Sequence, residues 1–185
     1  MSTTVAEVLE WSKRPSGRVG IISTLIAVTT LANLIMIRMP EPLAEYDLSP
    51  ILIYTLGVLM NPLDALIIIA VAQGIGTTIK ALSFGWPLVF IPGAMVVRGV
   101  EALIIGLIVR KFEKIKTLSV TKTEVVAMII GVIWETVGFT VADVILFGPA
   151  MAAITLLTIV DAVFIPIALS LVAAIRRSIR VYRLT

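Results

Sequence analysis

The stretch from Val125 to Phe147, VVAMIIGVIWETVGFTVADVILF, decides the fold class of this chain. It is apolar almost throughout, and a helix of about 20 such residues is long enough to cross the hydrocarbon core of a bilayer. Two acidic residues, Glu135 and Asp143, interrupt it. A charged side chain inside a membrane is costly unless it is paired or faces a polar cavity, so such residues mark functional sites by default. The stretch therefore predicts a transmembrane helix that carries a polar site.

The composition of the whole chain agrees with a membrane protein. Its 185 residues are 59% hydrophobic and 15% charged, and the mean hydropathy is +1.09. Soluble domains carry fewer apolar and more charged residues. The chain contains no cysteine and no histidine, which excludes disulfides, thiolate or imidazole metal ligands and histidine-based acid–base chemistry. We therefore expect an all-α integral membrane protein that needs no metal or other cofactor.

Further apolar runs lie on both sides of this stretch. A polar segment, residues 1–18, precedes them and can form a short interfacial helix on the cytoplasmic face. A basic tail, residues 176–185, follows them. The membrane domain, residues 19–175, is then expected to hold six transmembrane helices. The five additional runs are Val19–Ile37, Pro50–Met60, Ala65–Ile79, Gly93–Val109 and Ala150–Ile175.

The second run is too short to cross the membrane alone, because its length corresponds to about 16 Å of helix. It either extends backward or pairs with the third run as a shallow hairpin around Asn61 and Pro62. No lysine or arginine lies in that turn, so charge does not separate the two possibilities. The near-span length of the third run favours six full spans.

Basic residues indicate the orientation. Most of the 15 lysines and arginines precede the first run, join the fourth run to the fifth, or follow the sixth. Because positive residues favour the cytoplasmic side, we expect both termini in the cytoplasm and a multi-pass protein of the cell membrane. The net charge of +3 is spread over these positions and does not form one patch with interleaved aromatic residues. The expected macromolecular surroundings are therefore the lipid bilayer and not nucleic acid.

Ionisable residues inside the spans define the candidate site. Arg98 and Glu101 share one helix face at i and i+3, so they can pair with each other as a structural element. The remaining acids would then lack a basic partner from the spans, although Lys80 could reach Asp143 at the outer surface. Unpaired acids must be protonated, be hydrated or bind a ligand. The five residues are Arg98, Glu101, Glu135, Asp143 and Asp161.

Aromatic residues gather near the turn between the third and fourth runs, at Phe84, Trp86 and Phe90. They fit two structures. One is an aromatic belt at the membrane interface, and the other is a lid over a ligand.

Two stretches carry a resemblance to a known family. Leu56–Gly76, LGVLMNPLDALIIIAVAQGIG, has a proline-centred turn followed by a helix rich in small residues, and Glu135–Asp161, ETVGFTVADVILFGPAMAAITLLTIVD, combines an acid, glycine plus aromatic, a glycine turn and a final polar residue. Together with the length and the basic link, they resemble the S component of energy-coupling factor (ECF) transporters, the vitamin-binding subunit of ATP-driven importers. The chain departs from the family pattern at Asn61, at Phe139 and at Asp161, where glycine, tyrosine and asparagine are common.

The resemblance implies a ligand site near the outer face between the last three helices. Glu135, Gly138, Phe139 and Asp161 would line or shape the pocket. Arg98, Glu101 and Trp86 are compatible with it by position, and Asp143 stands at its outer end. Small residues of the first helix, Ser23 and Ala27, would contact the coupling membrane subunit.

The expected function is therefore capture of a small vitamin-like ligand without catalysis. The chain has no phosphate-binding Gly-Lys-Ser/Thr loop, so ATP hydrolysis would come from paired ATPase partners. The acids favour a ligand with cationic or donor groups, such as a thiamine-like compound or a pyrimidine precursor, while Arg98 leaves a neutral or anionic vitamin open. Two alternatives remain, namely a proton-coupled secondary transporter that uses Glu135 or Asp161 and a non-transporting envelope scaffold. An intramembrane hydrolase is least favoured because no nucleophile has a histidine base.

Overall fold

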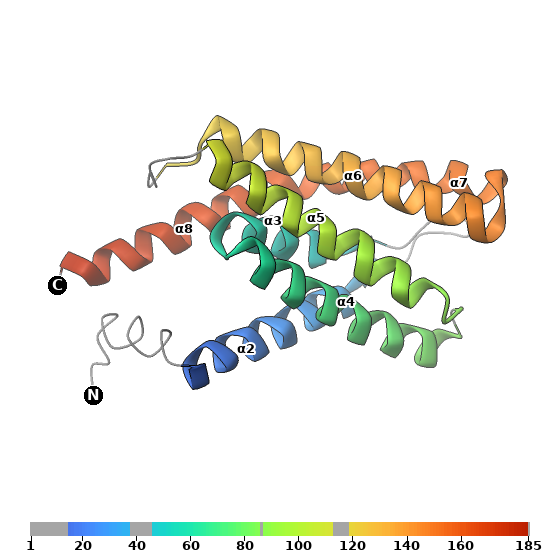
Figure 1. Cartoon of the computed structure of the whole chain (residues 1–185), viewed down its shortest axis with the longest axis horizontal. Coiled ribbons are helices and arrows are strands. Elements are labelled where there is room, and N and C mark those ends of the chain that lie inside the picture. The colour runs from blue at the N-terminus through green and yellow to red at the C-terminus, as the bar shows by residue number, and fades with distance from the viewer. Residues whose placement is uncertain (1–14, 38–45, 86, 113–118, 185) are drawn as a thin grey trace.

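The computed structural model describes residues 15–37, 46–85, 87–112 and 119–184, which form an almost entirely helical bundle (Figure 1). The expected interfacial helix before residue 15 and the aromatic Trp86 lie outside the described residues. The elements in chain order are α2 (Pro15–Leu34), β1 (Met36–Ile37), β2 (Tyr46–Asp47), α3 (Ser49–Leu59), α4 (Pro62–Phe84), α5 (Phe90–Phe112), α6 (Lys122–Phe147), α7 (Pro149–Thr155), the 3-10 helix η1 (Leu156–Phe164) and α8 (Ile165–Leu184).

Within the described residues, five helical segments are long and apolar enough to cross a membrane. They are α2, α4, α5, α6 and the continuous stretch Leu156–Ser178 of η1 and α8. The sixth expected helix, α3, has 11 residues and is shorter than a span. The last helix continues to Leu184, so the basic tail expected as a separate segment extends α8. An all-α membrane protein is thus confirmed at this level.

Local sequence signals explain where the helices begin and end. The Asn61 side chain accepts a hydrogen bond from the backbone N–H of Leu63, and Pro62 occupies the first turn of α4. Thr121 and Glu124 form a reciprocal capping box at the start of α6. Gly85 ends α4 with a φ of 74°, a left-handed conformation that favours glycine.

The helices run side by side, and the start of α2 and the end of α8 lie at the same end of the bundle (Figure 1). We call this end, where α2 begins and α8 finishes, the terminal end, and the opposite end the distal end. Two ion pairs fasten helices at the terminal end: Arg18 with Asp64, and Arg176 with Glu124. The last residues of α5 and the first of α6 also lie there, which is the arrangement expected if the bundle alternates direction.

A short antiparallel pair of strands enters the distal half of the bundle. Met36 of β1 lies opposite Asp47 of β2, and the backbone N–H of Leu48 donates to the carbonyl of Ala32 at 3.1 Å. This pairing holds the start of α3 beside the last turn of α2. As a result, α3 begins within the bundle and runs to the terminal end, where Arg110 donates to the carbonyl of Met60.

Small residues allow α5 to approach its neighbours closely. A Cβ atom placed on Gly106 would stand 3.0 Å from the carbonyl oxygen of Gly57 in α3, and one on Gly138 of α6 would stand 3.0 Å from a methyl of Val97. These contacts agree with the close packing that small residues favour in membrane bundles. The outward faces carry exposed apolar side chains, such as Ile67 and Val71 of α4, as expected for contact with lipid.

Candidate functional site

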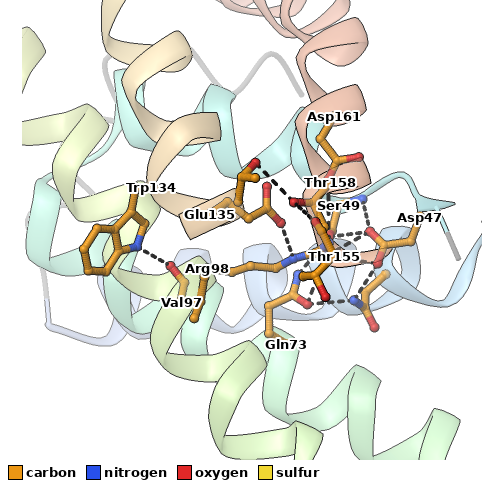
Figure 2. Close-up of polar contacts among 12 residues, drawn as sticks. Asp47, Ser49, Gln73, Val97, Arg98, Trp134, Glu135, Thr155, Thr158 and Asp161 are labelled. Atoms are coloured by element: carbon orange, nitrogen blue, oxygen red, sulfur yellow. Dashed lines mark hydrogen bonds and ion pairs between the residues drawn. The ribbon is translucent and has the colours of Figure 1, made fainter. Parts of the chain in front are cut away.

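The guanidinium of Arg98 lies at the centre of a buried polar cluster (Figure 2). Arg98 stands eight residues into α5, which places it about 12 Å from the distal start of that helix. Its side chain is 12% exposed. Figure 2 shows the side chain extending between Glu135 on one side and Asp47 with Ser49 on the other. Nε donates to Glu135 Oε1 at 2.9 Å, and Nη1 contacts Asp47 Oδ2 at 3.0 Å, Asp47 Oδ1 at 3.2 Å, Gln73 Oε1 at 3.3 Å and the hydroxyl of Ser49.

Asp47 is the second centre of the cluster, although sequence reasoning missed it. Its Oδ2 lies 3.2 Å from Nζ of Lys80, and its Oδ1 accepts from the backbone N–H of Ser49 at 2.8 Å. Burial by itself would raise the pKa of the Asp47 carboxyl. The charges of Arg98 and Lys80 and the hydrogen bonds from Ser49 outweigh burial and hold the pKa below its ordinary value. An ionised Asp47 also suits the positive end of the α3 dipole.

Two amide side chains complete this half of the cluster. Asn33 Nδ2 donates to Gln73 Oε1 at 2.7 Å and to Asp47 Oδ2 at 3.1 Å, while Gln73 Nε2 donates to the Ser49 hydroxyl at 2.8 Å. Gly76 makes room for Asn33, because a Cβ there would stand 2.2 Å from Asn33 Oδ1. Sequence reasoning missed Asn33, Ser49 and Gln73 as well. Asn33 and Gln73 carried a usable signal, since each is a polar residue inside an otherwise apolar helix.

Arg98 and Glu101 do not form the pair that their spacing on one helix allows. Arg98 turns toward Glu135 and Asp47, and neither carboxylate oxygen of Glu101 has a hydrogen-bond partner. The reason is the position of β2, which brings a carboxylate from outside the spans to the end of the Arg98 side chain. Glu101 instead lies against α6, where a Cβ on Gly131 would stand 3.3 Å from its Cγ.

Asp161 reaches the cluster from η1 (Figure 2). Its Oδ2 lies 3.9 Å from Arg98 Nη2, at the outer limit of an ion pair. The Asp161 carbonyl accepts a hydrogen bond from the hydroxyl of Tyr54 at 3.4 Å, and Thr158 donates to the Thr136 hydroxyl at 3.1 Å. The structure thus brings Glu135 and Asp161 together around one arginine, on neighbouring helices as the sequence indicated.

Asp143 and Lys80 do not form the contact considered from the sequence. Asp143 accepts a hydrogen bond from Thr155, which fastens α7 to the distal end of α6, and Lys80 is buried and pairs with Asp47. Asp143 therefore joins two helices beside the cluster.

The remaining predicted residues fall into two groups. Phe139 lies at the cluster, with its ring centroid 5.9 Å from Arg98 Cζ, which is within the range of a cation–π contact. Gly138, beside it, holds α6 against α5. Ser23 and Ala27 lie on an exposed face of α2 and take no part in the cluster. Trp134, which the sequence did not single out, points away from the cluster and donates to the carbonyl of Val97 at 3.0 Å (Figure 2).

The cluster combines charged side chains with neutral amides and hydroxyls. Across the described parts of the chain, no three acidic side chains are arranged to hold a metal ion. The cations Arg98 and Lys80 face carboxylates from β2, α6 and η1, and many of the remaining contacts are with neutral amides and hydroxyls. A buried polar cluster built from seven elements inside an apolar bundle is typical of a small membrane protein with a functional site between its helices.

Comparison with known protein families assigns the chain to a particular family of membrane proteins. Residues 16–177 match the family described as ECF-type riboflavin transporter, S component, and the chain belongs to this family. This confirms the resemblance to an ECF S component and the assignment to the cell membrane. No curated protein and no solved structure matched the chain.

Proposed function

We propose that this protein is the substrate-binding subunit of an ATP-driven riboflavin importer, and that it captures its ligand in the distal half of the bundle between α5, α6 and η1. The observation that carries the proposal is the buried cluster around Arg98 in a member of this family. The acids of the cluster offer hydrogen-bond acceptors, and Phe139 offers an aromatic face.

Riboflavin fits this chemistry. Its flat ring system is largely apolar and can pack on an aromatic side chain, and its sugar-alcohol chain carries several hydroxyl donors. The sequence favoured a ligand with cationic or hydrogen-bond-donating groups. Riboflavin supplies hydrogen-bond donors but no positive charge. Glu135 and Asp161 would accept from the hydroxyl groups, while Gly138 and Phe139 would shape the wall beside the ring.

The proposed orientation places the distal end outside the cell. The basic residues near the terminal ends of the helices support a cytoplasmic location for both termini. The proposed topology has six passages of the membrane. The second passage is formed by α3 together with the strands before it. This orientation would let ligand enter from outside and would leave the terminal end near cytoplasmic partners.

The subunit itself would be non-catalytic. ATP hydrolysis and the transport stroke would come from paired ATPases and a coupling membrane subunit. The exposed positions of Ser23 and Ala27 on α2 support a contact there, because small exposed residues permit close helix approach.

Ligand capture is tested by purifying the protein in mild detergent and measuring riboflavin binding through quenching of flavin fluorescence and by titration calorimetry. We expect saturable binding at one site per chain. Glu135→Gln should weaken it by about one order of magnitude or more, since a charge-assisted hydrogen bond contributes about 1.5 to 3 kcal/mol. Asp161→Asn should lower the affinity less than Glu135→Gln, because the amide keeps an acceptor oxygen. Asp64→Asn, in the ion pair with Arg18 at the terminal end, is the matched control.

A proton-coupled transporter is the second candidate, and Glu101 is the observation that favours it. Its fully buried carboxylate has no partner, as expected of a group that exchanges a proton. Proteoliposomes that contain only this protein separate the two functions. Uptake driven by a pH gradient supports the secondary transporter, and binding without uptake supports the subunit.

A further inference from the structure

An apolar groove lies between the last turns of α5 and the first turns of α6, at the terminal end of the bundle (Figure 1). Its volume is about 380 Å³, within the range of about 300 to 1,000 Å³ that is usual for ligand sites. Ile108 stands ten residues after Arg98 on α5, so the groove is about 15 Å along the helix from the polar cluster. The described residues that line the groove are Ile108 and Phe112 of α5 and Lys122, Thr123, Val126 and Ile130 of α6.

The groove opens on the outer surface of the bundle. Phe112 is 65% exposed and Val126 is 50% exposed, whereas Ile108 is half-buried and also packs against the hydrophobic core. Apolar side chains on the outside of a membrane-spanning bundle contact lipid, and a hollow between them must be filled by something equally apolar. An acyl chain is therefore the expected occupant of the apolar part of the groove.

Two lysines flank the groove, one from each helix. Lys122 lines it at the start of α6, and Nζ of Lys111 lies 5.6 Å from the centroid of the Phe112 ring at the end of α5. Within the described parts of the chain, neither lysine forms an ion pair with a carboxylate. Glu124, the acid in the first turn of α6, pairs with Arg176 instead. Both ammonium groups are thus available to a negatively charged head group.

We propose that this groove is a binding site for an anionic phospholipid, with an acyl chain on Ile108, Phe112, Val126 and Ile130 and the phosphate beside Lys111 and Lys122. Basic pockets between transmembrane helices are typical sites for anionic lipid head groups. A zwitterionic lipid carries the same phosphate together with a positive group of its own, so the lysines attract it less. Membrane orientation alone explains lysines at the ends of helices, but it does not require an apolar groove between them.

The experiment titrates the protein in mild detergent with phosphatidylglycerol or phosphatidylcholine of identical acyl chains and counts the bound lipid by native mass spectrometry. Each lysine near an anionic head group contributes about a fivefold gain in affinity, so the wild type should bind phosphatidylglycerol about 25-fold more tightly. Lys111→Gln and Lys122→Gln should each reduce this preference about fivefold. Arg177→Gln, which removes an exposed positive charge from α8 near the same end, is the matched control and should retain the full preference.

A second variant tests the groove itself. Val126→Trp leaves the charge unchanged and fills the hollow, so it should weaken both lipids about tenfold or more, the effect of excluding about two methylene groups from apolar contact. Circular dichroism melts confirm that each variant is folded, which is expected because these side chains are exposed.

The possible results decide the proposal. Equal affinity of the wild type for the two lipids would overturn it. An equal loss of preference in Arg177→Gln would also overturn it, because the preference would then belong to the net charge of this end of the bundle. Wild-type lipid affinity in Val126→Trp would remove the groove as the site. If that variant instead lost co-purification with a coupling subunit, the occupant would be a partner helix and not a lipid.

Discussion

Replacement of Asp47 by asparagine tests the central claim that this residue holds the polar cluster together. The substitution keeps the size of the side chain and removes its charge. Asp47 is 5% exposed and contacts Arg98, Lys80, Asn33 and Ser49. Removal of one partner from a buried ion pair costs about 3 to 5 kcal/mol, because the opposite charge stays buried without full compensation.

The expected loss is large enough to measure. A protein of this size loses about 2 to 4 °C of melting temperature per kcal/mol, so Asp47→Asn should unfold about 6 to 20 °C below the wild type. Thermal unfolding in mild detergent, followed by circular dichroism, gives the shift. Asp64→Asn is the matched control, because its partner Arg18 has a 60% exposed side chain and such surface pairs contribute about 0 to 1 kcal/mol.

The pH dependence supplies an independent test of the same residue. The pKa of Asp47 is lowered in the folded protein, so the unfolded chain binds its proton more readily. The stabilisation from Asp47 is therefore complete above the unfolded pKa, about 3.9, and is lost as the pH falls through the lower folded pKa. The difference in melting temperature between wild type and Asp47→Asn should be constant near neutrality and should shrink below about pH 4. A melting temperature for Asp47→Asn within about 2 °C of the control at pH 7 would refute the reasoning.

Three further predictions concern topology, coupling and ligand binding. For topology, Lys111→Cys should resist an impermeant thiol reagent added to intact cells while Leu88→Cys, at the distal turn, reacts; the opposite pattern would reverse the orientation. For coupling, Ser23→Leu combined with Ala27→Leu should abolish co-purification with the coupling subunit and preserve riboflavin affinity, and retained co-purification would remove this face from the contact. For binding, Phe139→Ala should lower the affinity for riboflavin about tenfold, since ring stacking contributes about 0.5 to 1.5 kcal/mol beyond burial. Wild-type affinity by calorimetry would mean that the riboflavin ring system does not pack on Phe139.

The sequence predicted the helices well because each span must bury its backbone in a bilayer and therefore shows as a long apolar run. The turn at Asn61 and Pro62 was also predicted, whereas the capping box at Thr121 was not, although its sequence follows the same local rules. The 3-10 stretch Leu156–Phe164 in the last span was not predicted, because it has the same apolar composition as an α-helix. Hydropathy reports length and composition and does not report the winding of the backbone.

Part of the polar site could also be predicted from the apolar runs. Acids inside apolar runs are conspicuous, so Glu135 and Asp161 were found, and their common partner Arg98 was named with them. The sequence suggested Glu101 as a partner of Arg98, and this contact is not formed. Spacing on one helix reveals neighbours at i+3 and i+4, but it does not reveal a residue that another element brings close. Asp47 lies outside every apolar run, where an acid is ordinarily exposed to water, and only the pairing of β1 with β2 brings it into the bundle.

The short α3 helix explains how a membrane bundle can hold this many charges. Because α3 begins inside the distal half, its first residue Ser49 and the preceding Asp47 both contact Arg98. Irregular backbone inside a membrane is tolerated where protein surrounds it, and here the Asp47 carboxylate accepts a hydrogen bond from the backbone N–H of Ser49. Asp47 thus supplies Arg98 with an internal counter-ion, while both carboxylate oxygens of Glu101 and one of Glu135 have no hydrogen-bond donor. A ligand that brings its own donors would complete those hydrogen bonds, so the half-length helix determines both the stability of the cluster and the chemistry that the proposed ligand must supply.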